Sequence, residues 1–339
     1  MTIEFIWQLP TSGDGRYSHA DVTRRGERAT PGHVPFTDGV SDPRGDRFNY
    51  FDYLHQVARA ADITGFDGVL VPHDLEGDES WIVAGYLARG TRHVRLIAGF
   101  DAGWGSAVYA AKNAVSFQRA TNGRFAWQIV QGHDAATRRR HADNVPDADV
   151  LARIDEFVTV ARGVQTTAPY DFKGRFFEVQ GGGFRGPLGG NPLPPVYLGG
   201  ASEEAFALSA RQADVHVLDA APVDELRPHI ARLQELASAQ GRTLAIGLRI
   251  DVLAREDAAE ARCDADLYWS QTRQDRASGE RRTLVGSYDD VEQHLADYAA
   301  AGISSFVLGA TPHLEEAWRF GEHLLPRLRA RLAQDRQAA

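Results

Sequence analysis

Short apolar runs alternate with segments of helical periodicity along most of the chain. Eight runs rich in branched and aromatic side chains have the length of buried strands, and they cover residues 3–9, 68–71, 94–98, 125–130, 196–198, 215–218, 246–253 and 305–308. Between these runs, apolar side chains recur at three- and four-residue steps, as at Phe51, Leu54, Val57, Ala58 and Ala61. Glycines follow several such segments, so we predict helices over residues 107–121, 223–240 and 288–301 among others.

This alternation predicts the fold class. Parallel strands need crossover connections, and a helix between successive strands supplies them. Eight such repeats predict an α/β fold, a (β/α)8 TIM barrel that takes residues 1–339 as a single domain. The alternative is an open doubly wound sheet, but the first strand is followed by LPTSGDG rather than by the G-x-G-x-x-G fingerprint of dinucleotide-binding sheets.

Three stretches exceed the usual length of barrel loops, and we assign them as insertions after strands 1, 4 and 7. Residues 11–49 are rich in Gly, Pro, Arg and Asp. Residues 165–195 contain YDFKGRFFEV, which predicts a β-hairpin around Lys173 and Gly174. Residues 266–286 are polar and carry four arginines. Because active sites of barrels lie at the carboxyl ends of the strands, we expect the first and third insertions to act as lids.

The composition narrows the possible partners. The 339 residues include 37 Lys and Arg against 46 Asp and Glu, a net charge of −9, which argues against nucleic acid or an anionic membrane as the main partner. The lone Cys263 excludes a disulfide framework and a multi-cysteine metal centre. The sequence also shows no long apolar span and no signal-peptide pattern, so we expect a globular, cytoplasmic protein.

Glycines and a serine follow the predicted fifth strand directly. In Gly199-Gly200-Ala201-Ser202, the glycines allow a ligand to approach the backbone, and the N–H groups of the following helical turn can bind an anion. The structural alternative is an ordinary helix N-cap after a tight turn.

Arg249 and Asp251 alternate on the predicted seventh strand, so both side chains point to the same face of the sheet. Charges between apolar neighbours are costly unless they pair or face a ligand. The pair therefore indicates either a substrate-facing site or a structural salt bridge.

Other polar clusters give weaker signals. His73-Asp74 and His133-Asp134 do not come with the i, i+4 histidines or the further carboxylates of a metal site, so we predict no metal. Arg138-Arg139-Arg140-His141 is typical of a solvated loop in an acidic protein. No G-x-S-x-G is present, so serine hydrolase chemistry has no support.

Several phrases in these positions resemble the bacterial luciferase-like flavin-dependent monooxygenases, and among them the alkanesulfonate monooxygenase branch. The stretches that carry the resemblance, in chain order, are FIWQLPTSGDGRY, AADITGFDGVLVP, AVSFQRATNGR, PPVYLGGASEEA, IGLRIDVLARE, TLVGSYDDVEQHLADYAAAGISSFVLG and PHLEEAWRFGEHLLP. They span nearly the whole chain, and the family has a (β/α)8 barrel with insertions.

The resemblance implies a two-component enzyme. A separate NAD(P)H-dependent flavin reductase would supply reduced FMN, and dioxygen would add to the flavin to form a (hydro)peroxide that oxygenates a small polar organic substrate. The cofactor supplies this chemistry, while the protein orients it and keeps water out. In the alkanesulfonate branch the reaction releases sulfite and an aldehyde. A homodimer or homotetramer is also implied.

The resemblance further implies roles for individual residues. Gly199, Gly200, Ala201 and Ser202 match the turn that holds the flavin phosphate, and Val130, Gln131 and Gly132 match residues that line the flavin. Arg249 matches an arginine that stabilises substrate anion or peroxide, with Asp251 and His313 as candidates for proton handling. The candidates for substrate binding are Trp7, His73, Trp104 and Asp219.

The sequence departs from the sulfonate branch at several of these places. Gly77 stands where that branch has Cys, Asp251 where it has His, and Asp219 where it has Trp. Val150 and Leu151 replace an Arg-Tyr pair that helps clamp phosphate. Carboxylates at positions 219 and 251 would repel a sulfonate unless an arginine offsets them, and they would suit an amine or polyhydroxylated substrate.

Two other functions stay open. The first is a hydride-transferring relative that uses a deazaflavin on the same barrel and ignores dioxygen. The second is a non-catalytic binding homologue that has lost the flavin, for which the altered phosphate clamp is the argument.

Overall fold

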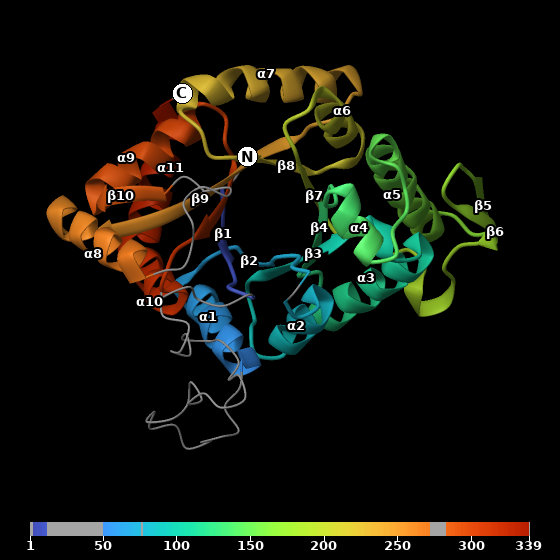
Figure 1. The fold of residues 1–339 in the computed structure, drawn as a ribbon, viewed down its shortest axis with the longest axis horizontal. Helices are drawn as coiled ribbons and strands as arrows, with labels where there is room; N and C mark the ends of the chain where they lie inside the picture. Colours follow the sequence, from blue (N-terminus) through green and yellow to red (C-terminus); the bar gives the residue numbers. More distant parts are fainter. Residues whose placement is uncertain (1–2, 12–49, 76, 272–282, 339) are drawn as a thin grey trace. The chain divides into compact units, whose positions relative to one another are not determined.

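The computed structural model describes residues 3–11, 50–75, 77–271 and 283–338. Its main sheet has the strand order β10-β9-β11-β1-β2-β3-β4-β7-β8, and β9 also pairs with β8, so the order closes on itself. The fold is therefore the predicted (β/α)8 barrel (Figure 1). The strands of this sheet are β1 (Glu4–Gln8), β2 (Gly68–Val71), β3 (Arg95–Asp101), β4 (Phe125–Val130), β7 (Val196–Gly199), β8 (Val215–Asp219), β9 (Ala245–Arg255), β10 (Thr283–Ser287) and β11 (Ser305–Gly309).

The chain divides into two compact units. The first unit comprises Met1–Val94, Asp219–Arg227 and Gly247–Ala339. In it, β1 lies between β2 and β11, β9 pairs with β11 and β10, and all of these pairings are parallel. Its helices are α1 (Tyr50–Thr64), α2 (Ser80–Ala88), α8 (Ala258–Gln271), α9 (Tyr288–Ala300), α10 (His313–Arg319) and α11 (Leu325–Ala338), with a π-helical turn at Phe320–Leu324.

The core of the first unit is aromatic. Phe5 on β1 stacks on Phe306 of β11 with ring centroids 5.5 Å apart, and Phe320 packs against both Phe5 and Trp7. Helix α1 ends at Gly65, whose φ of 90° is in the left-handed region that glycine adopts without strain. Helix α9 begins with a capping box between Ser287 and Asp290.

The second unit comprises Arg95–Leu218 and Pro228–Ile246. In it, β4 pairs in parallel with β3 and β7, and β7 pairs with β8. Phe100, Trp127 and Phe157 form its aromatic centre. Its helices are α3 (Ala107–Thr121), α4 (Ala135–Arg140), α5 (Val150–Thr166), α6 (Glu203–Gln212) and most of α7 (Val223–Ala239), with shorter turns at Ala102–Trp104, Asp147–Asp149 and Gly186–Leu188.

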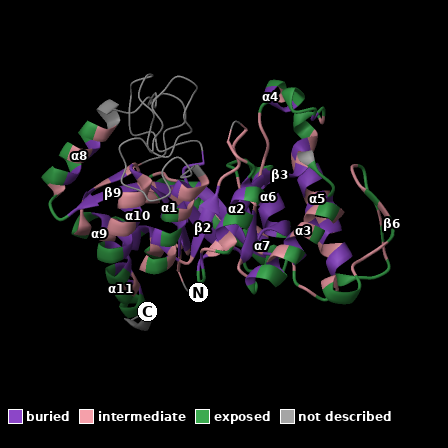
Figure 2. Cartoon of the chain, turned by 90° about the horizontal axis from the view of Figure 1, so that it is seen from below, coloured by how far each residue is buried: buried purple, intermediate pink, exposed green. Residues whose placement is uncertain are grey.

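Burial follows the predicted pattern. Strand residues are largely buried, and the helices carry buried residues on one side and exposed residues on the other, as α9 and α11 show (Figure 2). This one-sided burial is what a helix packed on a sheet requires. Within the described residues, every helix is too short or too polar to cross a membrane.

All eight predicted strands are present, and the hairpin is confirmed as the antiparallel pair β5 (Tyr170–Lys173) and β6 (Glu178–Gly182). β10 was missed, because its five residues lie within the predicted insertion 266–286. The predicted bounds of that insertion were wrong, since residues 266–271 belong to α8 and residues 283–286 to β10. The predicted lids at residues 12–49 and 272–282 lie outside the described residues.

Candidate active site

The turn that follows β7 is shaped by glycine and closed by a helix cap. Gly200 has φ 105°, and a Cβ there would come within 2.3 Å of the Gln131 side chain. Ser202 is the N-cap of α6, and its Oγ accepts the backbone N–H of Ala205 at 3.1 Å. The structural alternative is confirmed, since Ser202 caps α6, and anion binding at this turn stays a prediction.

Gln131 joins the end of β4 to this turn. Its Nε2 donates a short hydrogen bond to the carbonyl oxygen of Gly199. Because β4 and β7 are parallel neighbours, their carboxyl ends meet, and the bond brings the segment of Val130, Gln131 and Gly132 against the turn of Gly199 and Gly200. The two predicted cofactor-binding segments are therefore in contact.

The buried His216 contacts the turn that follows β7. His216 on β8 is 0% exposed, with Nδ1 2.7 Å from Ser209 Oγ and Nε2 3.1 Å from the carbonyl oxygen of Gly200. Burial lowers the pKa of His216 to about 4, so the ring is neutral at pH 7. In the tautomer that satisfies both contacts, Nε2–H donates to Gly200 and Nδ1 accepts from Ser209.

The first turn of α6 carries two acidic residues. Glu203 forms an ion pair with Arg232 of α7. The Glu204 carboxylate accepts hydrogen bonds from its own backbone N–H and from the Ser202 hydroxyl, which hold its pKa below the usual value. Glu204 thus takes the place at the helix N-terminus that an anionic ligand would use.

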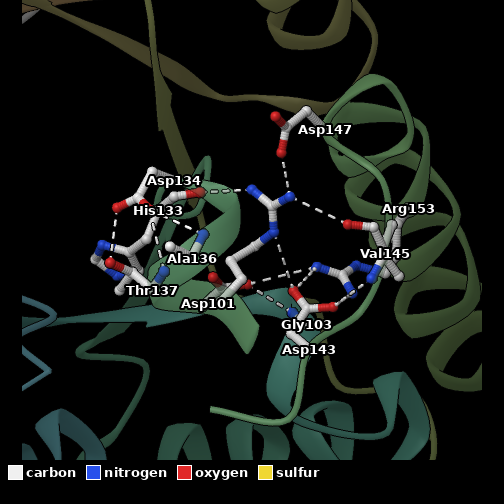
Figure 3. A network of polar contacts seen from close by, with 11 residues as sticks. Asp101, Gly103, His133, Asp134, Ala136, Thr137, Asp143, Val145, Asp147 and Arg153 are labelled. Carbon is white, nitrogen blue, oxygen red and sulfur yellow. Dashed lines mark hydrogen bonds and ion pairs between the residues drawn. The ribbon is translucent and has the colours of Figure 1, made fainter. Parts of the chain in front are cut away.

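A buried network of arginines and aspartates lies beside the end of β4 (Figure 3). Arg153 of α5 binds Asp143 through two parallel hydrogen bonds of 2.7 and 2.8 Å. Arg138 of α4 donates to the carbonyl oxygens of His133 and Val145 and pairs with Asp147. These bonds therefore hold together the segment that connects β4 to α5.

The burial of Arg138 contradicts the prediction that Arg138-Arg139-Arg140-His141 is a solvated loop. Arg138 is 4% exposed and lies 3.6 Å from the Asp143 carboxylate through Nε, whereas its neighbours Arg139 and Arg140 are exposed, and all three lie in helix α4 rather than in a loop. A buried guanidinium requires carboxylate or carbonyl partners, and Arg138 finds them in His133, which precedes it, and in Val145 and Asp147, which follow it.

Asp101, at the end of β3, completes this network. Its Oδ1 accepts the N–H of Gly103 at 2.7 Å and lies 4.0 Å from Arg153 Nη2. Its Oδ2 is buried and has no hydrogen-bond partner among the described residues. A Cβ on Gly132 would lie 3.5 Å from this oxygen, so Asp101 borders the predicted flavin-lining segment.

In the first unit, Arg249 and Asp219 form an ion pair. Arg249 Nε and Nη2 both donate to Asp219 Oδ1, at 2.9 and 2.6 Å. Asp251 lies on the same side of β9, and Ile250 between them is fully buried on the other. The strand register sets Asp251 level with Gly309, where β11 ends.

The remaining predicted site residues, His313, Trp7, His73 and Trp104, lie at different positions in the fold. His313 begins α10, and its ring lies edge-on to Trp7 with centroids 6.2 Å apart. Trp7 is fully buried and also packs against Phe66, so the structure places it in the core, because its side of β1 faces the helices. His73 follows β2 and is half-buried. Trp104 lies in a helical turn, and its side chain is outside what the structure describes.

A flavin phosphate needs hydrogen-bond donors, and the turn after β7 offers several. The turn at Gly200, the N-cap Ser202 and the backbone N–H groups of α6 suit a phosphate. Val150, which replaces one member of the predicted clamp, is 5% exposed and gives no donor. A phosphate at this turn would be held by backbone N–H groups and the Ser202 hydroxyl rather than by arginine, and it would have to displace the Glu204 carboxylate from them. The described residues contain no cluster of three His, Cys, Asp or Glu that could hold a metal ion.

Sequence reasoning missed several polar residues around this site. A signal existed for His216, which is the one polar residue within an apolar run of strand residues. A signal also existed for Arg153, which lies on the buried face of α5 with Ile154 and Phe157. Asp101 and Asp143 carried no comparable signal, because only the folded chain brings them to these arginines.

Comparison with known proteins gives a family and a fold. The family model described as luciferase-like monooxygenase matches residues 28–305. Among solved structures, a riboflavin lyase (RcaE) with modified FMN and riboflavin is 16% identical, with 98% of this chain and 92% of that chain covered and a TM-score of 0.79. An EDTA monooxygenase from Chelativorans sp. BNC1 is 16% identical, with 98% and 94% covered and a TM-score of 0.77.

A third structure is an F420-dependent secondary alcohol dehydrogenase. It is 14% identical, with 97% of this chain and 99% of that chain covered and a TM-score of 0.69. At such identities the likeness establishes the fold. It does not assign a cofactor or a substrate to this chain, since enzymes with different cofactors share the barrel.

Proposed function

The chain belongs to the luciferase-like monooxygenase family, and from this premise we propose that it is a reduced-FMN-dependent monooxygenase that oxygenates a small polar organic substrate. A separate flavin reductase would deliver the reduced cofactor, and dioxygen would be the second substrate. The protein would act as a homodimer or homotetramer.

One observation carries this proposal: the hydrogen bond from Gln131 to Gly199 unites the two segments that the resemblance assigns to the flavin. His216 contacts the carbonyl oxygen of Gly200 through a hydrogen bond, so the turn is held in place before any ligand binds. Such preorganisation lowers the entropic cost of binding.

We assign the residues the following roles. Ser202 and the first N–H groups of α6 would bind the phosphate, with Gly199, Gly200 and Ala201 giving the close approach. Val130, Gln131 and Gly132 would line the ring system. Reduced flavin, when bound, supplies the electrons that activate dioxygen. Arg249 would oppose negative charge, Asp251 and His313 would hold or move protons, and His73, Trp104 and Asp219 would contact substrate.

A second candidate function is hydride transfer with a deazaflavin. The likeness to an F420-dependent dehydrogenase favours it, because the same barrel serves that cofactor there. A third, non-catalytic role would follow if the carboxylates of Glu203 and Glu204 keep phosphorylated flavins away from α6.

The test is an anaerobic titration of the purified protein with photoreduced FMN and, separately, with reduced F420, followed by rapid mixing with aerated buffer. We expect FMN to bind when reduced, and its reoxidation rate to differ from that of free flavin. Preferential binding of F420 with no response to dioxygen would replace the proposal by the dehydrogenase. Binding of neither cofactor would leave the non-catalytic role.

A further inference from the structure

Arg249 does not present its guanidinium freely to a ligand. Two hydrogen bonds use the edge formed by Nε and Nη2, and both end on Asp219 Oδ1. This edge is one of the two that can bind a carboxylate, sulfonate or phosphate side-on. Asp219 therefore occupies one of the two edges of Arg249 that an anionic head group could bind.

The backbone holds Asp219 in this position. The N–H of Ala220, the next residue, donates to the carbonyl oxygen of Arg249 at 3.2 Å. One residue further, the carbonyl oxygen of Ala221 accepts a hydrogen bond from Tyr298 Oη at 2.8 Å. The segment after β8 is thus anchored to β9 and to α9, and this backbone holds Asp219 next to Arg249 although 76% of the Asp219 side chain is exposed.

A second carboxylate adds to the effect. Asp251 lies two residues beyond Arg249, so its side chain projects from the same face of β9. Among the described residues, two carboxylates thus accompany Arg249, that of Asp219 at the end of β8 and that of Asp251 on β9. An anion that bound the Nε–Nη2 edge of Arg249 would have to displace Asp219, whereas a cation meets the carboxylate of Asp219.

From this arrangement, and resting on the proposed function, we infer that Asp219 is a specificity-determining residue that masks Arg249 and selects a substrate with a protonated amine over one with an anionic head group. Specificity here comes from repulsion as well as attraction, because the carboxylates disfavour anions while they bind the ammonium. Arg249 holds the Asp219 carboxylate in place through two hydrogen bonds.

Binding of matched probes tests the inference. Hexylamine and hexane-1-sulfonate share one alkyl chain and differ in charge, and their affinities for the full-length protein can be measured calorimetrically at pH 7. We expect the wild type to bind the amine more tightly. Asp219→Asn should tighten sulfonate binding about tenfold and weaken amine binding several-fold, because the unmasked guanidinium gains a free edge.

The double variant Asp219→Asn/Arg249→Gln should lose the gain in sulfonate binding, which assigns that gain to Arg249. Asp224→Asn, which removes an exposed carboxylate from α7 near the same segment, is the matched control and should leave the ratio of the two affinities unchanged. An unchanged ratio in Asp219→Asn, a wild-type preference for the sulfonate, or binding of neither probe would overturn the inference.

Reduced-FMN binding is measured on the same variants. If Asp219→Asn binds FMN as the wild type does but keeps the wild-type probe ratio, only the selectivity inference fails. If the probe ratio shifts as expected while neither protein binds reduced flavin, the proposed function fails instead.

Discussion

The carboxylate of Asp143 lies parallel to the guanidinium of Arg153, with Nη1 2.7 Å from Oδ1 and Nη2 2.8 Å from Oδ2. Both residues are buried, at 5% and 6% exposure. The hydrogen bonds from Arg153 hold the pKa of Asp143 below its ordinary value. This pair holds the segment between β4 and α5 in place, so its loss should lower the free energy of unfolding.

Replacing Asp143 by Ala should lower the free energy of unfolding by about 3–5 kcal/mol, because Arg153 would be left buried without its main partner. Urea denaturation followed by circular dichroism measures this change. Asp147→Ala is the control, since Asp147 pairs with Arg138 but has 73% of its side chain exposed. That variant should lose less than about 1 kcal/mol, and equal losses in the two variants would contradict the argument.

The buried His216 should make stability depend on pH. Its folded-state pKa of about 4 lies below the ordinary value of 6.5, so the unfolded chain binds a proton that the folded chain does not. The free energy of unfolding should therefore fall as the pH drops from 6.5 to 4, by about 3 kcal/mol from this residue.

Thermal unfolding at a series of pH values tests this prediction on His216→Gln, which keeps a side-chain N–H but cannot become charged. The variant should show a flatter dependence between pH 4 and 6.5. His294→Gln, at an exposed position of α9, should keep the wild-type slope. A variant at position 216 with the wild-type slope would disprove the assignment.

Gly200→Ala should weaken flavin binding more than it weakens the fold. The new methyl group would meet the Gln131 side chain and break its contact with the turn. We expect at least about a tenfold loss of reduced-FMN affinity, as for a misplaced binding group. Gly190→Ala is the matched control, because Gly190 also has a positive φ of 73° but open space around its Cβ position. It should show the backbone strain alone and bind flavin normally.

Glu204→Gln should raise the affinity for FMN relative to riboflavin. The substitution removes a negative charge that caps the N-terminus of α6, where the phosphate would bind. Because this charge lies at an exposed helix N-terminus, the expected gain is about two- to fivefold. Glu225→Gln, at an exposed position of α7, should leave the ratio unchanged. Equal gains for FMN and riboflavin would show that the phosphate binds elsewhere.

Much of the architecture follows from short-range patterns in the sequence. The helix over residues 107–121 was predicted to its ends, because Gly123 with φ 84° and the left-handed Asn122 stop it locally. The hairpin of β5 and β6 was likewise visible in two aromatic runs around Lys173 and Gly174. The candidate positions on β4, β7 and β9 were found because polar residues at the ends or on one face of an apolar strand stand out.

The sequence by itself thus determined the order of strands and helices, and with it the barrel, since hydrophobic period and turn chemistry act over a few residues. Only the tertiary structure decided that Arg138 is buried while Arg139 is exposed, that His216 supports Gly200, and that Asp219 binds Arg249 across 30 residues of sequence. Such pairings depend on strand register and on the paths of the connecting segments. No local pattern encodes them, because the favourable energy of each contact exists only once the partners have been brought together.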